Sequence, residues 1–170
     1  LKAGLYFLDA DMVGVGVIPA DAWSEPHSHR FAVVVLSAFS RKLGSPQPGD
    51  AWIDGTRQAT ADLRASELAV ITADYVRRLG FGATAHTPTS TTVDLGRVAL
   101  QCGLVESVGG QLRAPYLPGG FALAVVSTDM ELAPDAPLAR RGLIDRLRST
   151  SSLGWMLGWG GTRAGIGRLN

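Results

Sequence analysis

The sequence contains very little cysteine, since Cys102 is the only one among its 170 residues. A single cysteine excludes an internal disulfide bond, and it excludes any metal or iron–sulfur site built from cysteines within this chain. No apolar run reaches the roughly 18 residues of a membrane-spanning helix, and no signal peptide is visible. These absences predict a protein of the reducing cytoplasm with no membrane partner.

The chain also lacks an excess of charge of either sign, with 16 basic and 15 acidic residues and a net charge of +1. This balance gives no electrostatic reason to expect nucleic acid or a lipid surface as a partner. Hydrophobic residues make up 46% of the chain and charged residues 18%, which is typical of a globular domain with a sizeable core. Because the chain opens on Leu1 without a methionine, we expect it to be a piece of something longer.

The pattern of apolar runs and turn residues predicts helices packed around a mixed β-sheet, which is an α+β architecture. Glycine and proline residues predict a loop over 40–55. The predicted helices are the first residues up to Leu8, 57–79, 93–102 and 138–148, and the predicted strands are 12–18, 31–36, 81–87 and a pair around the Pro-Gly-Gly turn at 118–120. We expect residues 1–148 to form one domain and 149–170 to form a tail rich in glycine, serine and tryptophan.

The long helix carries an apolar stripe formed by Leu68, Ile71, Tyr75 and Leu79, spaced three, four and four residues apart. This spacing places the four side chains along one face of a helix, which we predict to be the face toward the core.

The pair Gly14 and Gly16 does not fit a dinucleotide fingerprint, because both glycines lie inside a predicted strand and the third position is Pro19. We interpret them as sites where a helix packs closely on the sheet.

The three histidines do not by themselves form a metal site or a catalytic group. His27 and His29 provide only two imidazoles, which is too few for a zinc site, so we interpret them as a surface pair. His86 lies at the end of the third strand with no obvious carboxylate nearby, and no G-x-S-x-G sequence marks a nucleophile. The sequence therefore assigns neither catalytic residues nor a metal.

A polar loop after the third strand and three glycines further on form the candidate binding site. The loop contains Thr87, Ser90 and Thr91, and its hydroxyls follow a strand end, where small-molecule sites collect. A flat ligand is able to approach the backbone closely at glycine, and the two bends are expected to converge on one shallow hollow. The alternative is a pair of turns that merely need glycine. The site residues of this hypothesis are Thr87, Ser90, Thr91, Gly103, Gly109 and Gly110.

The order of several short stretches resembles the cobalamin-dependent reductive dehalogenases and their relative epoxyqueuosine reductase. The stretches are a helix ending in Arg-x-Leu-Gly-aromatic, a glycine-bearing segment, and a strand leading to Thr-Asp-x-x-Leu with Pro-Asp-x-Pro close behind. They lie here at 77–81, 103–110 and 128–137, and the resemblance covers most of residues 1–138.

The resemblance implies a three-layer, nitroreductase-like core in which a corrinoid lies against the loops that follow the strands. It also implies reductive chemistry at cobalt, fed by two iron–sulfur clusters. The sequence departs from the family at the positions where the functional residues are expected. Val105 replaces a family glycine, and no cysteines follow Pro137. Ala65 lies where we would look for the catalytic tyrosine of the dehalogenases, and the catalytic aspartate of the tRNA-modifying relative would fall among the hydroxyl residues 89–92.

Electron delivery from within this chain is therefore excluded by ligand count, and the sequence gives no support for proton delivery. The first hypothesis is a cobalamin-binding, dehalogenase-like domain without iron–sulfur clusters that takes electrons from a donor protein, if it is an enzyme at all. The second is a non-catalytic core that acts as a scaffold, forming a homodimer or associating with the rest of a longer protein. The third is a flavin-binding relative of the nitroreductases that holds FMN.

Overall fold

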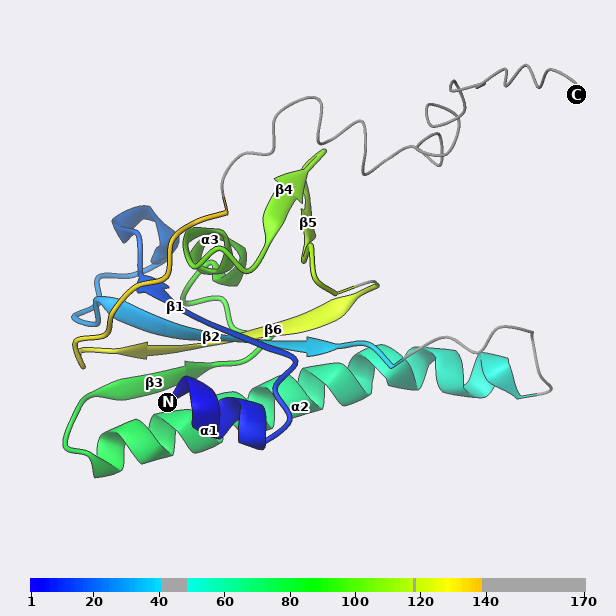
Figure 1. Cartoon of the computed structure of the whole chain (residues 1–170), viewed down its shortest axis with the longest axis horizontal. Helices are drawn as coiled ribbons and strands as arrows, with labels where there is room; N and C mark the ends of the chain where they lie inside the picture. Colours follow the sequence, from blue (N-terminus) through cyan, green and yellow to red (C-terminus); the bar gives the residue numbers. More distant parts are fainter. Residues whose placement is uncertain (41–48, 118, 139–170) are drawn as a thin grey trace, which may run out of the picture. The chain divides into compact units, whose positions relative to one another are not determined.

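The computed structural model describes residues 1–40, 49–117 and 119–138, and Figure 1 shows their arrangement. Residues 1–138 form one compact unit. The predicted helix over 138–148 and the tail over 149–170 lie outside the described residues, so this division of the chain stays a prediction. The elements are α1 (Lys2–Phe7), β1 (Met12–Val17), a 3-10 turn (Ala20–Ala22), β2 (Phe31–Ala38), α2 (Asp50–Arg78), β3 (Ala83–His86), α3 (Leu95–Gln101), β4 (Glu106–Val108), β5 (Gln111–Arg113) and β6 (Phe121–Thr128).

Four strands form the main sheet in the order β1-β2-β6-β3, and β4 pairs with β5 in a separate hairpin. Each of the three neighbouring pairs in the main sheet is antiparallel. The α+β class predicted from the sequence is confirmed. No parallel pair occurs among the described strands, although a mixed sheet was expected, and the nitroreductase-like assignment stays a prediction.

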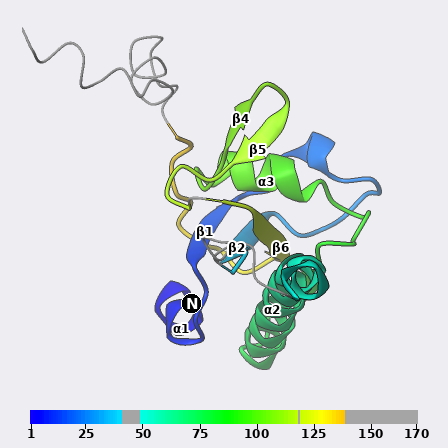
Figure 2. The ribbon, with the colours of Figure 1, turned by 90° about the vertical axis from the view of Figure 1, so that its right-hand side faces the viewer.

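The helices lie on both faces of this sheet. Figure 2 shows α1 and α2 on one side of the strands, and α3 with the β4–β5 hairpin on the other. Side chains alternate along each strand, so neighbouring valines of β2 belong to two separate cores. Val33 and Val35 pack toward α2, whereas Val34 and Leu36 pack toward α3.

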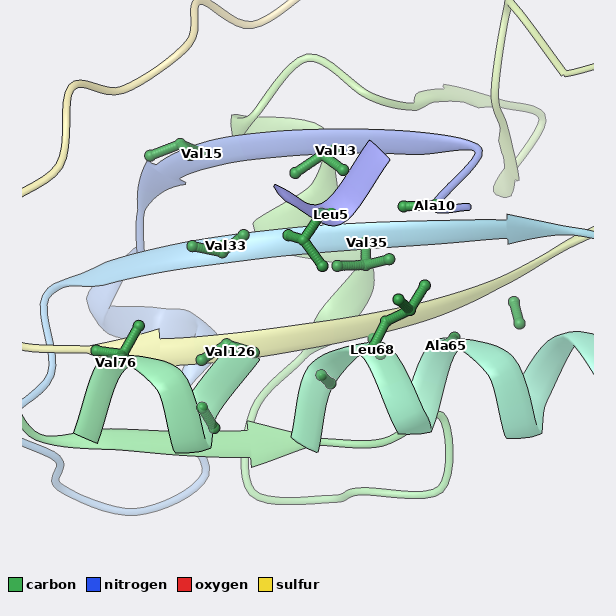
Figure 3. Close-up of a cluster of buried hydrophobic side chains, with 14 of the residues drawn as sticks. Leu5, Ala10, Val13, Val15, Val33, Val35, Ala65, Leu68, Val76 and Val126 are labelled. Atoms are coloured by element: carbon green, nitrogen blue, oxygen red, sulfur yellow. The ribbon is translucent and has the colours of Figure 1, made fainter. Parts of the chain in front are cut away.

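The buried face of α2 consists mainly of alanine rather than the predicted stripe of large residues. Among the stripe residues Leu68 is only 3% exposed, but Ile71 and Tyr75 are 50% and 52% exposed. Figure 3 shows Leu68 and Val76 pointing toward the strands of the sheet. The prediction was wrong because alanine carries little hydrophobic signal, although its small side chain lets the helix approach the sheet closely. The buried α2 residues are Ala61, Ala65, Leu68, Ala69, Thr72, Ala73 and Val76.

The opposite face of the sheet confirms the interpretation of Gly14 and Gly16. A Cβ on Gly14 would lie 2.8 Å from Cγ of Leu104, and a Cβ on Gly16 would lie 2.6 Å from Sγ of Cys102. The end of α3 and the residues after it therefore occupy the space that side chains on β1 would take.

Helix α2 begins at Asp50, seven residues before the predicted start at Arg57. The predicted loop over 40–55 is therefore wrong from Asp50 onward. Gly49 adopts a φ of 97° just before the helix, and Gly55 lies inside it. A single interior glycine costs about 1 kcal/mol relative to alanine, which a 29-residue helix tolerates.

The strands on either side of the predicted Pro-Gly-Gly turn both exist, but they do not pair with each other. β5 pairs with β4, and β6 pairs with β2 and β3 in the main sheet. The segment that was expected to be a turn between two paired strands instead connects β5 of the hairpin to β6, an inner strand of the main sheet.

The segment after β6 returns along the free edge of β1. The backbone N–H of Asp135 donates to the carbonyl of Val15 at 2.8 Å, and the side chain of Asp135 accepts from the Val15 N–H at 2.7 Å. The same carboxylate pairs with Lys2 of α1 at 2.5 Å. These contacts satisfy edge groups of β1 that would otherwise remain open for pairing. No helix among the described residues is long and apolar enough to cross a membrane.

Candidate functional site

All three histidines of the chain gather at one end of the main sheet. His27 and His29 precede β2, and His86 is the last residue of β3. The rings of His27 and His29 lie 4.3 Å apart between centroids. Trp23 stacks on His27 at 4.2 Å and meets His86 edge-on at 5.7 Å. We call these four residues together with Ser127 the histidine cluster.

A buried serine connects two of the imidazoles. The hydroxyl of Ser127 lies 2.8 Å from Nε2 of His86 and 2.9 Å from Nδ1 of His29. Nδ1 of His86 lies 2.9 Å from the hydroxyl of Thr92. Ser127 is fully buried and His86 is 2% exposed, so both ring nitrogens of His86 are satisfied by the protein itself.

The pairing of β3 with β6 is what brings these residues together. In this register His86 lies opposite Val125, so its side chain points to the α3 side of the sheet. Ser127 follows Val125 by two residues and points to the same side. Trp23 then forms an isolated bridge to Val93, which draws the loop after β3 over the cluster.

Asp129 lies on the His29 side of the cluster. Its carboxylate and Nε2 of His29 both lie 3.0 Å from the position that a Cβ would take on Gly82, and its charge opposes the lowering of the pKa of His29. The tautomers of the two rings decide which groups donate in the contacts of Ser127 with His29 and His86.

Burial keeps two of these imidazoles neutral. Burial, with smaller contributions from the nearby His27 and His29, lowers the pKa of His86 to about 4. The pKa of His29 is also lowered, by burial and by His27, against an opposing effect of Asp129. Neutral imidazoles joined through a hydroxyl relay protons or orient hydrogen bonds, but they do not supply a fixed positive charge.

Beside the cluster lies an open hollow of about 520 Å³. This volume falls within the roughly 300–1,000 Å³ of small-molecule sites. Among the described residues, no group of three or more histidine, cysteine, aspartate or glutamate side chains is arranged to hold a metal ion. The hollow offers the aromatic ring of Trp23 and two imidazoles, with Glu25 and Arg30 as its charged residues. Its lining includes Val17, Trp23, Glu25, His27, His29 and Arg30.

The three predicted loop residues border this cluster. The hydroxyl of Ser90 lies 3.1 Å from that of Thr92, which in turn contacts His86. The carbonyl of Thr91 accepts from the hydroxyl of Ser24 at 2.7 Å, and the hydroxyl of Thr87 lies 3.2 Å from that of Thr89.

The three predicted glycines lie beyond the other end of α3. Gly103 has a φ of 69°, and a Cβ there would lie 2.3 Å from the carbonyl oxygen of Ala136. Its close approach is therefore to the chain itself. Gly109 and Gly110 form the turn between β4 and β5 with φ values of 59° and 80°, and a Cβ on either would meet no atom within 4 Å.

The length of α3 separates the loop from the glycines, because the loop precedes the helix and the glycines follow it. A seven-residue helix is about 10 Å long. The hollow beside the histidine cluster is lined by other residues than these six. The site prediction itself stays untested.

Solved structures of reductive dehalogenases resemble this chain closely. The catabolic reductive dehalogenase NpRdhA is 43% identical to it over 82% of its length, with a TM-score of 0.76. A second structure, described as suggesting a mechanism for B12-dependent dehalogenation, has the same identity and coverage with a TM-score of 0.75. Over this segment the chain is similar to the reductive dehalogenases in both sequence and fold.

The chain spans only about 20% of the length of the dehalogenases that it matches. Epoxyqueuosine reductases share the fold at low identity. One is 14% identical with a TM-score of 0.58 over 81% of this chain and 46% of its own. That from Bacillus subtilis is 13% identical with a TM-score of 0.55 over 81% and 47%. No protein-family model matches the chain, and no curated protein matches it.

The corrinoid expected of a reductive dehalogenase fits the described residues in part. Gly109 and Gly110 leave backbone open to a flat ligand, whereas the backbone at Gly103 is covered by residues 136–138. Cys102 is buried, and burial raises the pKa of its thiol to about 12, with the charge of Asp135 adding to the effect. This thiol is therefore a poor candidate for a metal-bound thiolate.

Sequence reasoning did not find the histidine cluster. His27 and His29 were interpreted as a surface pair, and His27 is indeed exposed and His29 partly buried, but their contacts with Trp23 and Ser127 were not foreseen. His86 was expected to have no carboxylate obviously nearby, and the charge of Asp129 acts on the pKa of His29 and not on that of His86. The contact between His86 and Ser127 joins residues 41 positions apart, and no local pattern indicates such a contact.

Proposed function

We propose that this chain is a cobalamin-binding, reductive dehalogenase-like oxidoreductase domain without iron–sulfur clusters of its own. The observation that carries the proposal is the 43% identity over 82% of the chain to dehalogenases, one of which is described as B12-dependent. Cobalamin, when bound, supplies reductive chemistry at its cobalt ion. Since Cys102 is the only cysteine, electrons would come from a separate donor protein.

Two surfaces support contact with the corrinoid. The turn at Gly109 and Gly110 leaves its backbone open, and the loop with Thr87, Ser90 and Thr91 presents hydroxyls beside the histidine cluster. Cobalamin is much larger than the ligands that fill a hollow of about 520 Å³, so it would lie across a surface rather than inside that hollow. The chain's own residues would bind and orient the macrocycle.

A titration of the purified protein with hydroxocobalamin, followed by absorption spectroscopy, tests this proposal. We expect a saturable shift of the corrin bands. Gly110→Ala should weaken binding because it adds a side chain where the ring approaches. Gly80→Ala is the matched control, since Gly80 also has a positive φ of 93° and open space around it.

The same titration with FMN distinguishes the cobalamin-binding proposal from the hypothesis of a flavin-binding protein. No corrin shift with a folded protein would contradict the proposal, and saturable FMN binding in its place would favour a flavin-binding relative. Equal weakening by Gly110→Ala and Gly80→Ala would show that backbone strain rather than a binding site is responsible.

A non-catalytic core that associates with other chains is the second candidate. It is favoured by the exposed apolar side chains of α1 and α2, which include Phe7 at 87% and Ile71 at 50% exposure. No absorption change with either hydroxocobalamin or FMN, together with a stable dimer, would favour this alternative.

A further inference from the structure

A continuous series of hydrogen-bonded side chains connects the hollow beside the histidine cluster with the loop after β3. Nδ1 of His29 lies 2.9 Å from the hydroxyl of Ser127, which lies 2.8 Å from Nε2 of His86. On the other side of that ring, Nδ1 of His86 lies 2.9 Å from the hydroxyl of Thr92, and the hydroxyl of Ser90 follows at 3.1 Å. We call these five residues the hydrogen-bond chain.

The middle of the hydrogen-bond chain is buried, whereas its ends are accessible. Ser127 is fully buried and His86 is 2% exposed. At one end His29 lines the hollow of about 520 Å³, and at the other end Thr92 is exposed on the loop. The hydrogen-bond chain therefore gives a polar path through a part of the protein that side chains close to bulk water.

Each group in the hydrogen-bond chain is able to accept a proton on one side and release a proton on the other. A hydroxyl is both donor and acceptor, and a neutral imidazole has one nitrogen of each kind. The pKa values of His29 and His86 are lowered, mainly by burial, so both rings are neutral near pH 7. The pairing of β3 with β6 holds His86 and Ser127 at this distance, because both belong to the main sheet.

A path of this kind matches a need of reductive chemistry at a covered surface. Replacing a carbon–halogen bond by a carbon–hydrogen bond consumes electrons and a proton and releases a halide ion. A macrocycle that lies across Thr87, Ser90 and Thr91 would shield their hydroxyls from water. Protons would then have to reach the loop from the protein side, where His86 contacts the hydroxyl of Thr92.

We propose that the hydrogen-bond chain carries protons from the hollow at His29 to the loop after β3. The use of these protons rests on the proposed cobalamin-binding function, whereas the path itself does not. In one passage a proton moves from His29 to Ser127 and another from Ser127 to His86. A further proton then moves from His86 to Thr92. No electrons move, and the original protonation returns when His29 takes a proton from water.

Exchange of the His86 ring proton with water, measured by NMR on the full chain without cobalamin, tests the path. In the wild-type protein this proton should exchange faster than the backbone amides of Val125 and Val126, which exchange through local opening. Ser127→Ala interrupts the path on the hollow side, and Thr92→Val interrupts it on the loop side. Each single variant leaves one end open and should change the rate little. The double variant should slow the exchange roughly tenfold or more.

A second pair of double variants keeps the buried serine, so the test does not depend on how well Ser127→Ala folds. His29→Gln combined with Thr92→Val should also slow the exchange, because an amide in place of the imidazole does not pass a proton on. His27→Gln combined with Thr92→Val is the matched control. The ring of His27 lies 4.3 Å from that of His29 but outside the hydrogen-bond chain, so this variant should behave like Thr92→Val alone. Circular dichroism checks that each variant is folded.

The proposal would be overturned by a wild-type ring proton that exchanges no faster than the amides of Val125 and Val126. Double variants that exchange as fast as the wild-type protein would overturn it as well.

Adding hydroxocobalamin then tests the use of the path. Because the bound macrocycle closes the loop end, exchange should persist in the wild-type protein and slow in Ser127→Ala alone. A shift of the corrin bands without this slowing would contradict delivery to a covered loop. No corrin shift, with the effect of the double variants intact, would contradict cobalamin binding and support the path.

Discussion

The two faces of the main sheet reach close packing by opposite means. On the α2 face the helix supplies small side chains, such as Ala65 and Ala69, and the strands supply valines. On the α3 face β1 supplies glycines, and Cys102 and Leu104 provide the larger groups that fill the space above them. On both faces, small side chains on one element lie opposite larger side chains on the element that packs against it.

This difference explains which sequence predictions succeeded. Glycine inside a strand is unusual enough to indicate a close contact, and Gly14 and Gly16 were interpreted correctly. Alanine in a helix is ordinary, so the alanine face of α2 gave no comparable signal. The larger residues Ile71 and Tyr75 drew the prediction to a face that is half exposed.

The strongest test of the α2 face is Ala69→Leu. Ala69 is fully buried in the core between α2 and the sheet, so a leucine there has no space. We expect a loss of about 3 kcal/mol in the free energy of unfolding, measured by urea denaturation. Ala59→Leu on the exposed side of the same helix should change stability little. A comparable loss in both variants would contradict the account of close packing.

Acid should destabilise the α3 face through His86. The pKa of His86 is about 4 in the folded protein, against an ordinary value of 6.5. Between pH 6.5 and pH 4 the His86 imidazole binds a proton in the unfolded chain but stays neutral in the folded protein. The free energy of unfolding therefore falls as the pH decreases from 6.5 to 4, by on the order of 3 kcal/mol.

Urea denaturation at about pH 7 and about pH 4.5, on either side of most of this range, measures the effect. His86→Gln should remove most of the difference between the two pH values, whereas His27→Gln, at an exposed position, should reduce it only slightly, because His27 is a smaller cause of the lowered His86 pKa than burial is. An NMR titration in which the His86 ring titrates near its ordinary pKa of 6.5 would contradict the burial of a neutral imidazole.

The glycines of β1 should give a smaller effect that a second substitution reverses. Gly16→Ala places a Cβ 2.6 Å from Sγ of Cys102 and should cost about 1–2 kcal/mol of stability. Combined with Cys102→Ala, which removes that sulfur, the same change should cost less than in the wild-type background. Additive losses in the double variant would mean that the two residues do not compete for space.

The parts of the fold that the sequence predicts are those with strong local patterns. The valine run of β2 and the apolar run of β1 indicate buried strands without any knowledge of their partners. The pairing of β3 with β6 and of β4 with β5 depends on long-range packing, which local patterns do not determine. Gly55 and the prolines before α2 concealed the true start of that helix.

The candidate site follows the same division. The loop with Thr87, Ser90 and Thr91 was predicted because polar residues follow a strand end. The partners of His86 were not, since Ser127 belongs to a strand whose place beside β3 the sequence does not reveal.

Amide chemical-shift mapping during a hydroxocobalamin titration tests the central claim of corrinoid binding most directly. The account predicts saturable shifts at Thr87, Ser90 and Thr91 and at Gly109 and Gly110, with little change along α1 and α2. An unchanged spectrum, or shifts confined to α1 and α2, would contradict it.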